Sequence, residues 1–323
     1  MGGISRWLYR LLRLLRADLF DLDPEWGVLG SDDPEHLSKV RRLLEKYHMY
    51  VEFATRGLGY DHLLRVVGAA DAGGADIIRT YIPITLNATK YRETEGDGKY
   101  DLRKIRLDFD PALFEEAMAS LKAIVPVLRQ YRVRIALENH EYETADELVE
   151  VIKKVDSPWI GLHYDFGNAM MAWEDPVEAA KKMAPYTFTT HFKDHIVIPC
   201  PEDKYGYVVC GVPAGEGNID LAECLRVMLD GSTLQRLNIE TCYPYCAQFK
   251  RTPGAGGVSQ VGEGCFKVES PLYPPEVIAP IQYYYPQEVS RELLEELLVK
   301  QKEGAVRSIA YACKLCREYG EKA

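Results

Sequence analysis

Four acid or imidazole side chains stand where apolar runs of the strand type end. Glu138 ends RIALE, Asp165 ends WIGLHYD, His191 ends TFTTH and Glu240 ends LNIE. Charged groups at the ends of buried strands need compensation, because an uncompensated buried charge is costly. Three carboxylates and one imidazole suit Mn²⁺ best, with Mg²⁺ or Co²⁺ as alternatives. The pattern therefore predicts one divalent metal ion held by these four residues.

Such a site requires a scaffold that gathers strand ends. Strand-like runs alternate with helix-like segments, which is typical of βαβ units and a parallel sheet. The predicted strands are 17–22, 50–54, 76–83, 134–138, 159–165, 187–192 and 237–241, and the predicted helices are 34–47, 60–72, 111–132, 144–155, 176–184 and 221–229. In a parallel barrel the C-terminal ends of the strands meet at one rim, so the four side chains can surround one ion.

The predicted fold is α/β, a (β/α)8 TIM barrel that forms a single domain over residues 1–323. Only seven strands can be counted, so the first strand is either missing, truncated or concealed before Trp7. An open doubly wound sheet is the alternative, but no glycine-rich phosphate loop follows an early strand.

Two segments look inserted into this pattern. Residues 87–110 are polar and rich in charge, and residues 242–287 are rich in Gly, Pro and Tyr. The second follows a strand, so in a barrel it lies over the active-site face. We expect it to be an active-site or interface loop that buries several tyrosines, followed by a C-terminal helix at 288–319.

Composition excludes some classes of protein. The net charge of −10 and the pI near 5.3 argue against nucleic acid as a partner. Residues 4–15 form a basic amphipathic pattern, too interrupted to cross a bilayer and most typical of a barrel helix. Eight cysteines occur without a visible secretory signal. We therefore expect reduced thiols in a cytoplasmic protein that binds no membrane.

The motifs ENHEYET, HYDFGN, HFKD, GEGNID and NIE resemble those of the sugar phosphate isomerase/epimerase family, within the xylose isomerase-like barrels. Ketose 3-epimerases are its best-known members, and the similarity covers roughly residues 32–240. The resemblance implies that Glu138, Asp165, His191 and Glu240 each supply one metal ligand. It also implies that the two glutamates move a proton beside a sugar carbonyl through a metal-stabilised enediolate, giving epimerisation or aldose–ketose isomerisation.

Other positions near the motifs have expected roles. The 3-epimerases usually have a histidine where this chain has Asn168, which can bind a hydroxyl but cannot relay a proton. His140 is the alternative relay, or a hydrogen-bonding support. Lys193 is expected to bind a substrate oxygen. Arg79 is expected to bind a phosphate or a carboxylate of the substrate, although a structural ion pair is equally expected for it. Asp194 is expected to orient His191 or Lys193.

Residues 215–220 are expected to form a turn, with Asp220 capping the next helix.

Three other functions remain open. The barrel could be the large (alpha) subunit of a carbon-glycoside deglycosidase, which acts on a 3-keto-glycoside with His140 as base and needs a small partner subunit. An abasic-site endonuclease shares the barrel, but its three zinc ions need more strand-end histidines and a less acidic surface than this chain has. A non-catalytic sugar-binding barrel is the alternative of another class. A small-molecule sugar or keto-sugar substrate and a homo-oligomer are expected.

Overall fold

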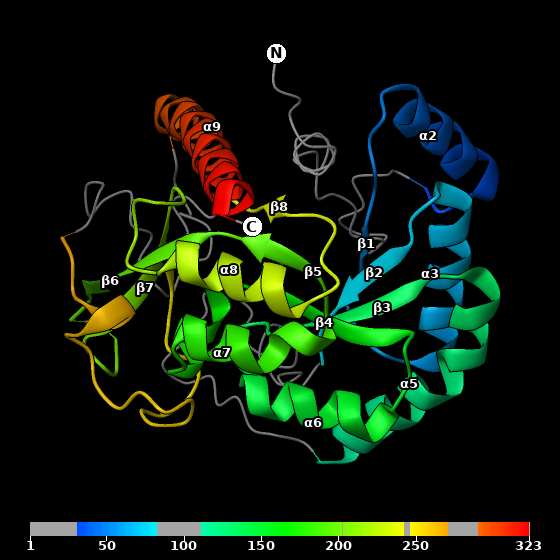
Figure 1. Ribbon diagram of the computed structural model, residues 1–323, viewed down its shortest axis with the longest axis horizontal. Helices are drawn as coiled ribbons and strands as arrows, with labels where there is room; N and C mark the ends of the chain where they lie inside the picture. The colour runs from blue at the N-terminus through cyan, green and yellow to red at the C-terminus, as the bar shows by residue number, and fades with distance from the viewer. Residues whose placement is uncertain (1–30, 83–110, 202, 242–245, 271–289, 323) are drawn as a thin grey trace.

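The computed structural model describes residues 31–82, 111–201, 203–241, 246–270 and 290–322 (Figure 1). The predicted segments 4–15, 17–22 and 87–110 lie outside these residues, as do all tyrosines of the segment 242–287. Within the described ranges, no helix is long and apolar enough to cross a membrane.

The described residues contain a curled sheet of six parallel strands. They are β1 (Phe53–Ala54), β2 (Ile77–Thr80), β3 (Arg134–Glu138), β4 (Ile160–Asp165), β5 (Thr187–Phe192) and β8 (Asn238–Ile239). Their order in the sheet is β1-β2-β3-β4-β5-β8. All neighbours pair in parallel. This half-barrel confirms the predicted α/β barrel architecture, and each of its strands falls within a predicted range.

Helices alternate with the strands along the chain and cover the outer face of the curl (Figure 1). They are α2 (Pro34–Lys46), α3 (Tyr60–Gly73), α5 (Pro111–Tyr131), α6 (Ala145–Val155), α7 (Pro176–Met183) and α8 (Leu221–Gly231). Local caps define several starts: Thr144 forms a capping box with Glu147, and Asp175 accepts hydrogen bonds at the start of α7. Asp220 caps α8 as predicted, accepting from the Glu223 N–H at 3.0 Å.

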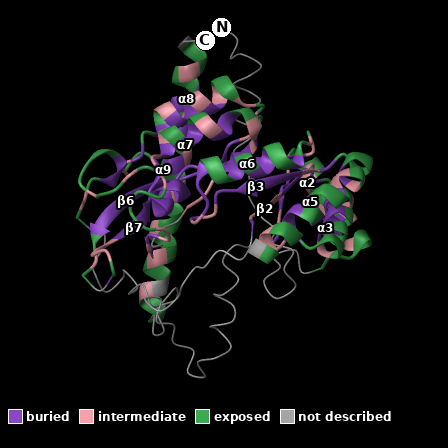
Figure 2. Ribbon diagram, turned by 90° about the horizontal axis from the view of Figure 1, so that it is seen from below, coloured by how far each residue is buried: buried purple, intermediate pink, exposed green. Residues whose placement is uncertain are grey.

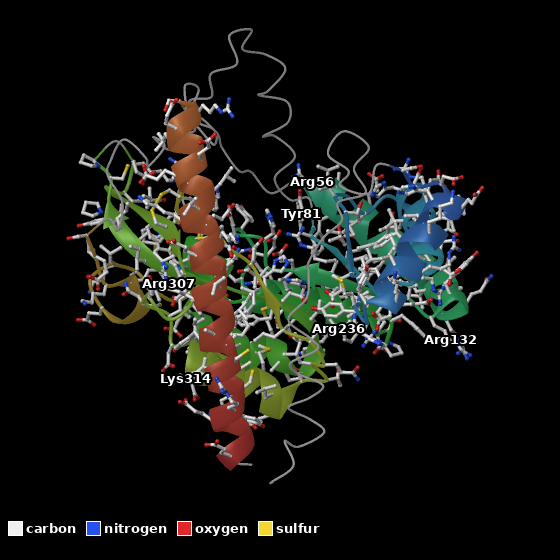
Figure 3. All side chains as sticks on the ribbon, turned by 90° about the horizontal axis from the view of Figure 1, so that it is seen from above. Arg56, Tyr81, Arg132, Arg236, Arg307 and Lys314 are labelled. Atoms are coloured by element: carbon white, nitrogen blue, oxygen red, sulfur yellow. A yellow bond between two sulfur atoms is a disulfide. The ribbon has the colours of Figure 1, made fainter. Side chains whose placement is uncertain are left out.

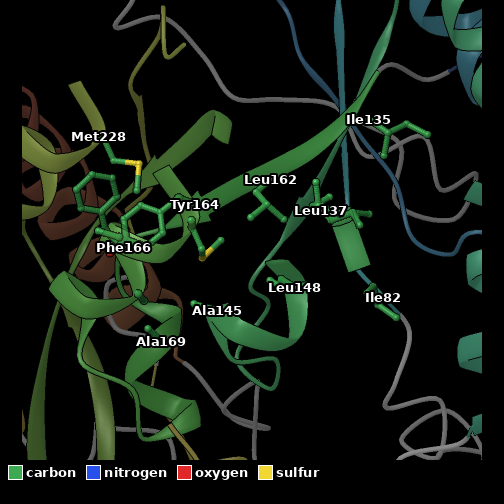
Figure 4. Close-up of a cluster of buried hydrophobic side chains, with 14 of the residues drawn as sticks. Ile82, Ile135, Leu137, Ala145, Leu148, Leu162, Tyr164, Phe166, Ala169 and Met228 are labelled. Atoms are coloured by element: carbon green, nitrogen blue, oxygen red, sulfur yellow. The ribbon is translucent and has the colours of Figure 1, made fainter. Parts of the chain in front are cut away.

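The core lies between the sheet and these helices. Leu137 and Leu162 on the strands pack in one cluster with Leu148 of α6 and Met228 of α8 (Figure 4). Exposure follows from this layering, with buried strands and exposed outer helix faces (Figure 2). Tyr164 is buried in the same cluster, and its hydroxyl donates to the Pro176 carbonyl at 2.6 Å. That bond ties the end of β4 to the start of α7.

Side chains connect the two edges of the sheet. Glu52, just before β1, accepts a hydrogen bond at 3.0 Å from the amide of Asn238 on β8. Arg236 lies 3.3 Å from Glu52 and 2.6 Å from Asp76. The sheet therefore curls until side chains at its first and last described strands come into contact, although these two strands do not pair. Tyr81, after β2, and Arg236, before β8, lie at opposite ends of the strands (Figure 3).

A second sheet departs from the predicted pattern. β6 (Asp194–Pro199) and β7 (Tyr207–Val212) form an antiparallel hairpin, and β9 (Cys246–Ala247) pairs with β7. Cys210 lies opposite Cys246 with a Cα–Cα distance of 4.3 Å, and the two form a disulfide. The expectation of reduced thiols is wrong for this pair, because the sheet places side by side two cysteines that are 36 positions apart in the sequence.

The described part of the inserted segment, residues 246–270, packs on the barrel. Phe249 stacks on Trp173 with ring centroids 4.0 Å apart, and Arg251 contacts Glu147 at 3.0 Å.

The last helix, α9 (Arg291–Lys322), agrees closely with the expected C-terminal helix and lies beside β8 and α8 (Figure 1). Its Ser308 hydroxyl accepts from the Ala214 N–H at 2.9 Å.

Candidate metal centre

The four predicted ligand residues lie at the C-terminal ends of four neighbouring strands. Glu138 is the last residue of β3 and Asp165 the last of β4, while His191 is near the end of β5 and Glu240 directly follows β8. Because the sheet order is β3-β4-β5-β8, the β6–β7 hairpin does not separate them in space. Asp165 and His191 are register partners across β4 and β5.

His191 stands at the centre of the group. Its Nδ1 atom lies 3.1 Å from Glu138 Oε1, 3.5 Å from Asp165 Oδ2 and 3.6 Å from Glu240 Oε2. Glu138 and Asp165 are fully buried and His191 is 5% exposed, whereas the Glu240 side chain is 35% exposed. Glu240 is therefore the most exposed of the four side chains.

These distances fit a divalent ion. Ligand atoms about 2.1 Å from an ion lie roughly 3.0–3.4 Å from one another in octahedral or tetrahedral geometry. The contacts from His191 Nδ1 to the three carboxylates, 3.1–3.6 Å, fall close to this range. Asp165, His191 and Glu240 also form one of two groups of described residues whose ligand atoms lie within 4.8 Å of each other.

Lys193 supplies a positive charge inside the group. Its Nζ atom lies 2.8 Å from Asp165 Oδ2 and 2.6 Å from Glu240 Oε2, and the side chain is 6% exposed. The ammonium thus contacts two of the carboxylates that a metal ion would use. A divalent ion that binds both of them competes with this ammonium.

Arg79 supplies a second positive charge. It extends from β2 and forms an ion pair with Glu138 Oε2, so the structural role considered for Arg79 is present here. Burial acts to raise the pKa of Glu138, but the Arg79 guanidinium and the His191 hydrogen bond outweigh it. The pKa of Glu138 therefore lies well below its usual range, and the carboxyl is ionised.

The other two carboxyls respond differently to their surroundings. Burial raises the pKa of Asp165 above its ordinary value, against the opposing charge of Lys193. Burial also acts to raise the pKa of Glu240, but the charges of Lys193 and His191 outweigh it and leave that pKa below its usual range. Glu138 and Glu240, the expected acid/base pair, are therefore the two held as carboxylates.

Asn139 holds the ligand strands in place, and the sequence analysis missed it. Its amide oxygen accepts from the Asp165 N–H at 2.7 Å, and its amide nitrogen donates to the Asp165 carbonyl at 3.0 Å. Asp165 Oδ1 accepts from the backbone N–H groups of Gly167 and Asn168, each at 2.9 Å. A side chain at Gly167 would collide with His195, since an added Cβ would lie 2.1 Å from that ring.

The remaining predicted residues fall near the rim. Asn168 is buried three residues after Asp165. His140 stacks on Tyr81 with ring centroids 4.4 Å apart, and burial lowers the pKa of its imidazole. His140 is therefore neutral at pH 7, as a proton acceptor must be.

Asp194 has a different role from the one expected. Its carboxylate accepts from the backbone N–H groups of Gly215 and Gly217 at 2.9 Å each, and from that of Ile219 at 3.3 Å. It also accepts from the His195 N–H at 2.9 Å. Asp194 thus fixes the turn at 215–219. Asp194 is the first residue of the β6–β7 hairpin, and its side chain points toward the turn at 215–219.

His163 is a second residue that the sequence analysis missed. It lies on β4 two positions before Asp165, on the same face of the strand, and its side chain is fully buried. Its ring packs edge-on against His191 with centroids 4.1 Å apart. Burial lowers its pKa well below the usual value, so the imidazole is neutral. The alternation HYD at the end of the strand was the available signal.

The profile of the xylose isomerase-like TIM barrel family matches residues 31–251, which include all four candidate ligands. The chain belongs to this family. These comparisons do not assign the chain to a subgroup of the family, because its similarity to individual proteins is distant.

Two curated proteins illustrate that distance. The 3-oxo-isoapionate decarboxylase of Pectobacterium atrosepticum is 28% identical over 196 residues, covering 61% of this chain and 62% of that protein. An uncharacterised protein of Escherichia coli, YihM, is 25% identical over 234 residues, covering 68% of this chain and 64% of that protein. The chain thus spans less than two thirds of the length of either relative.

Solved structures agree on the fold. A D-psicose 3-epimerase superposes with a TM-score of 0.54 at 12% identity, over 88% of this chain and 84% of that one. An L-ribulose 3-epimerase gives a TM-score of 0.52, also at 12% identity, over 88% and 81% of the two chains. At such identities the likeness establishes the barrel and no more.

Proposed function

We propose that this protein is a divalent-metal-dependent isomerase or epimerase that acts on a sugar or another polyhydroxylated carbonyl compound. The observation that carries the proposal is the placement of two glutamates about one imidazole. Glu138 and Glu240 come from strands separated by β4 and β5, and their oxygens lie 3.1 and 3.6 Å from His191 Nδ1. Two carboxylates on different strands can contact a bound sugar from two sides.

The chemistry needs a base, an acid and an electrophile. A divalent ion held by Glu138, Asp165, His191 and Glu240, most suitably Mn²⁺, would polarise the carbonyl and stabilise the charge that develops on its oxygen. One glutamate removes the proton from the carbon beside the carbonyl. The other returns a proton to the opposite face of that carbon, which inverts it, or a proton added to the neighbouring carbon gives isomerisation.

Three further residues are assigned to substrate binding. Lys193 and Arg79 already contact the ligand carboxylates, so both can donate to oxygens of a substrate beside the ion. The Asn168 side chain is buried beside Asp165 and can donate to a hydroxyl. His140, neutral and stacked on Tyr81, is assigned as a proton relay at the rim.

Isotope exchange combined with substitution tests the proposal. Glu138→Gln and Glu240→Gln should each keep the fold and lower turnover of a ketose by at least about 100-fold, the low end for general acid/base catalysis. In deuterated water the wild type should place deuterium on the carbon beside the carbonyl. Glu174→Gln is the control, because Glu174 is a buried carboxylate paired with Lys182 outside the site. Normal turnover in both variants would refute the acid/base assignment.

Decarboxylation of a 3-oxo acid is a second candidate. The similarity to the Pectobacterium decarboxylase favours it. The charges also favour it: Arg79 and Lys193 balance two of the three ligand carboxylates, so a divalent ion leaves one excess positive charge, which an anionic substrate would neutralise. Loss of CO₂ leaves the electron pair on the carbon beside the carbonyl, where a proton then adds.

The products distinguish decarboxylation from epimerisation or isomerisation. A lyase releases CO₂ from a 3-oxo sugar acid in a metal-dependent way and leaves neutral ketoses unchanged. An epimerase or isomerase interconverts neutral ketoses without CO₂. The homo-oligomer, the small partner subunit and the cytoplasmic location stay predictions.

A further inference from the structure

His163 occupies a position that the four-ligand arrangement does not use. Glu138 on β3 and His163 on β4 are register partners, so the two side chains start from adjacent points of the sheet. His163 also shares its strand face with Asp165, because side chains two positions apart in a strand point the same way. The ring therefore projects into the interior of the curl, directly beneath the rim.

The His163 ring is fully buried, and neither of its nitrogens has a hydrogen-bond partner among the described residues. A neutral imidazole carries one N–H and one lone pair, and both lose their water on burial. Buried polar groups are normally satisfied, so an exception calls for a bound water or ion. The edge-on contact with the His191 ring is too weak an interaction to replace either hydrogen bond.

A ligand group surrounds this ring. Glu138, His163 and His191 each offer a ligand atom, and these atoms all lie within 4.8 Å of one another. Two atoms about 2.1 Å from one ion are separated by at most about 4.2 Å, so a small side-chain adjustment brings all three into coordination. His195 is the useful contrast. It is fully buried nearby and its ring nitrogens also stand without a hydrogen-bond partner among the described residues, but it belongs to no such group, so the ligand group is what distinguishes His163.

We propose that His163 is a ligand of the divalent ion, together with Glu138 and His191. The inference rests on the proposed function in that it places an ion at this rim. With His163 added to the ligands proposed above, the donor set has two imidazoles and three carboxylates. The second imidazole strengthens the preference for Mn²⁺, Fe²⁺, Co²⁺ or Zn²⁺ over Mg²⁺, because imidazole nitrogen suits borderline metals and Mg²⁺ prefers oxygen.

Metal titration of substituted protein tests this assignment. His163→Phe keeps an aromatic ring in the buried space and removes the lone pair, and His163→Leu is made in parallel so that a variant with native far-UV circular dichroism is available. Calorimetry should show Co²⁺ binding weakened by at least about tenfold and Mg²⁺ binding changed by no more than about twofold. His195→Phe is the matched control and should bind both ions as the wild type does.

Pulsed electron paramagnetic resonance of the Mn²⁺-loaded protein gives an independent readout. The wild type should show nitrogen coupling from two imidazoles, and His163→Phe from one. Unchanged Co²⁺ affinity, or an equal loss of Co²⁺ and Mg²⁺ affinity, would overturn the assignment of His163. If the wild type binds no divalent ion at all, the proposed function fails together with this inference. If the wild type binds the ion and the His163 variants bind it equally well, only this inference fails and the proposed function stands.

Discussion

The ammonium group of Lys193 lies 2.6 Å from a carboxylate oxygen of Glu240. It also contacts Asp165, so a monovalent cation holds two of the carboxylates assigned to the metal. Lys193→Met should therefore raise the affinity for Mn²⁺ by at least about tenfold, since the competing charge is gone. Calorimetry measures the effect, with Lys182→Met as control because Lys182 pairs with Glu174 away from the site. Weaker Mn²⁺ binding would show that Lys193 supports the ion.

His191→Ala should weaken Mn²⁺ binding by at least about 100-fold, because His191 contacts all three candidate carboxylates. Equilibrium dialysis followed by metal analysis gives the value. Wild-type protein treated with a chelator should lose activity and regain it with Mn²⁺. If His191→Ala binds Mn²⁺ with wild-type affinity, His191 is not a ligand of the ion.

Glu143 should make stability fall as the pH rises. Burial raises its folded pKa to about 8, against 4.5 for the unfolded carboxyl. The folded state therefore holds one more proton between these values, and its contribution, full below pH 4.5, declines by about 1.4 kcal/mol per pH unit until pH 8.

Urea unfolding between pH 6.5 and 8 measures this slope. Unfolded histidines still titrate in the lower part of this range, but they do so equally in wild type and in a Glu143 variant, so the difference between the two slopes reports Glu143. Glu143→Gln should flatten the slope and raise stability at pH 8. The exposed Glu150→Gln on α6 should leave the slope as it is. Equal slopes for wild type and Glu143→Gln would show that Glu143 is ionised in the folded protein.

The Cys210–Cys246 disulfide closes a loop with a sequence separation of 36. Reduction should lower the free energy of unfolding by about 2–4 kcal/mol, because the unfolded chain regains conformational freedom. Thermal unfolding with and without reductant measures the loss, and the double variant Cys210→Ser, Cys246→Ser should no longer respond to reductant. Identical melting curves for oxidised and reduced wild type would contradict the prediction.

Much of the barrel can be predicted from local sequence signals. The predicted helix 111–132 is α5 at Pro111–Tyr131, and the strand 134–138 is β3. Such elements follow from apolar periodicity and from caps such as Asp220, which act over a few residues. Because parallel strands align their C-terminal ends, the sequence alone also placed the four candidate ligands on one rim. Their chemical roles stay proposals.

The tertiary structure decided which partner each polar side chain meets. The hairpin of β6 and β7 turns Asp194 toward the turn at 215–219, and sheet pairing sets Cys210 beside Cys246. Curling of the sheet brings Lys193 to Asp165 and places His163 against His191. These contacts join residues that are distant in the chain or lie on neighbouring strands. Their geometry depends on strand order, register and curvature, which local propensity does not encode.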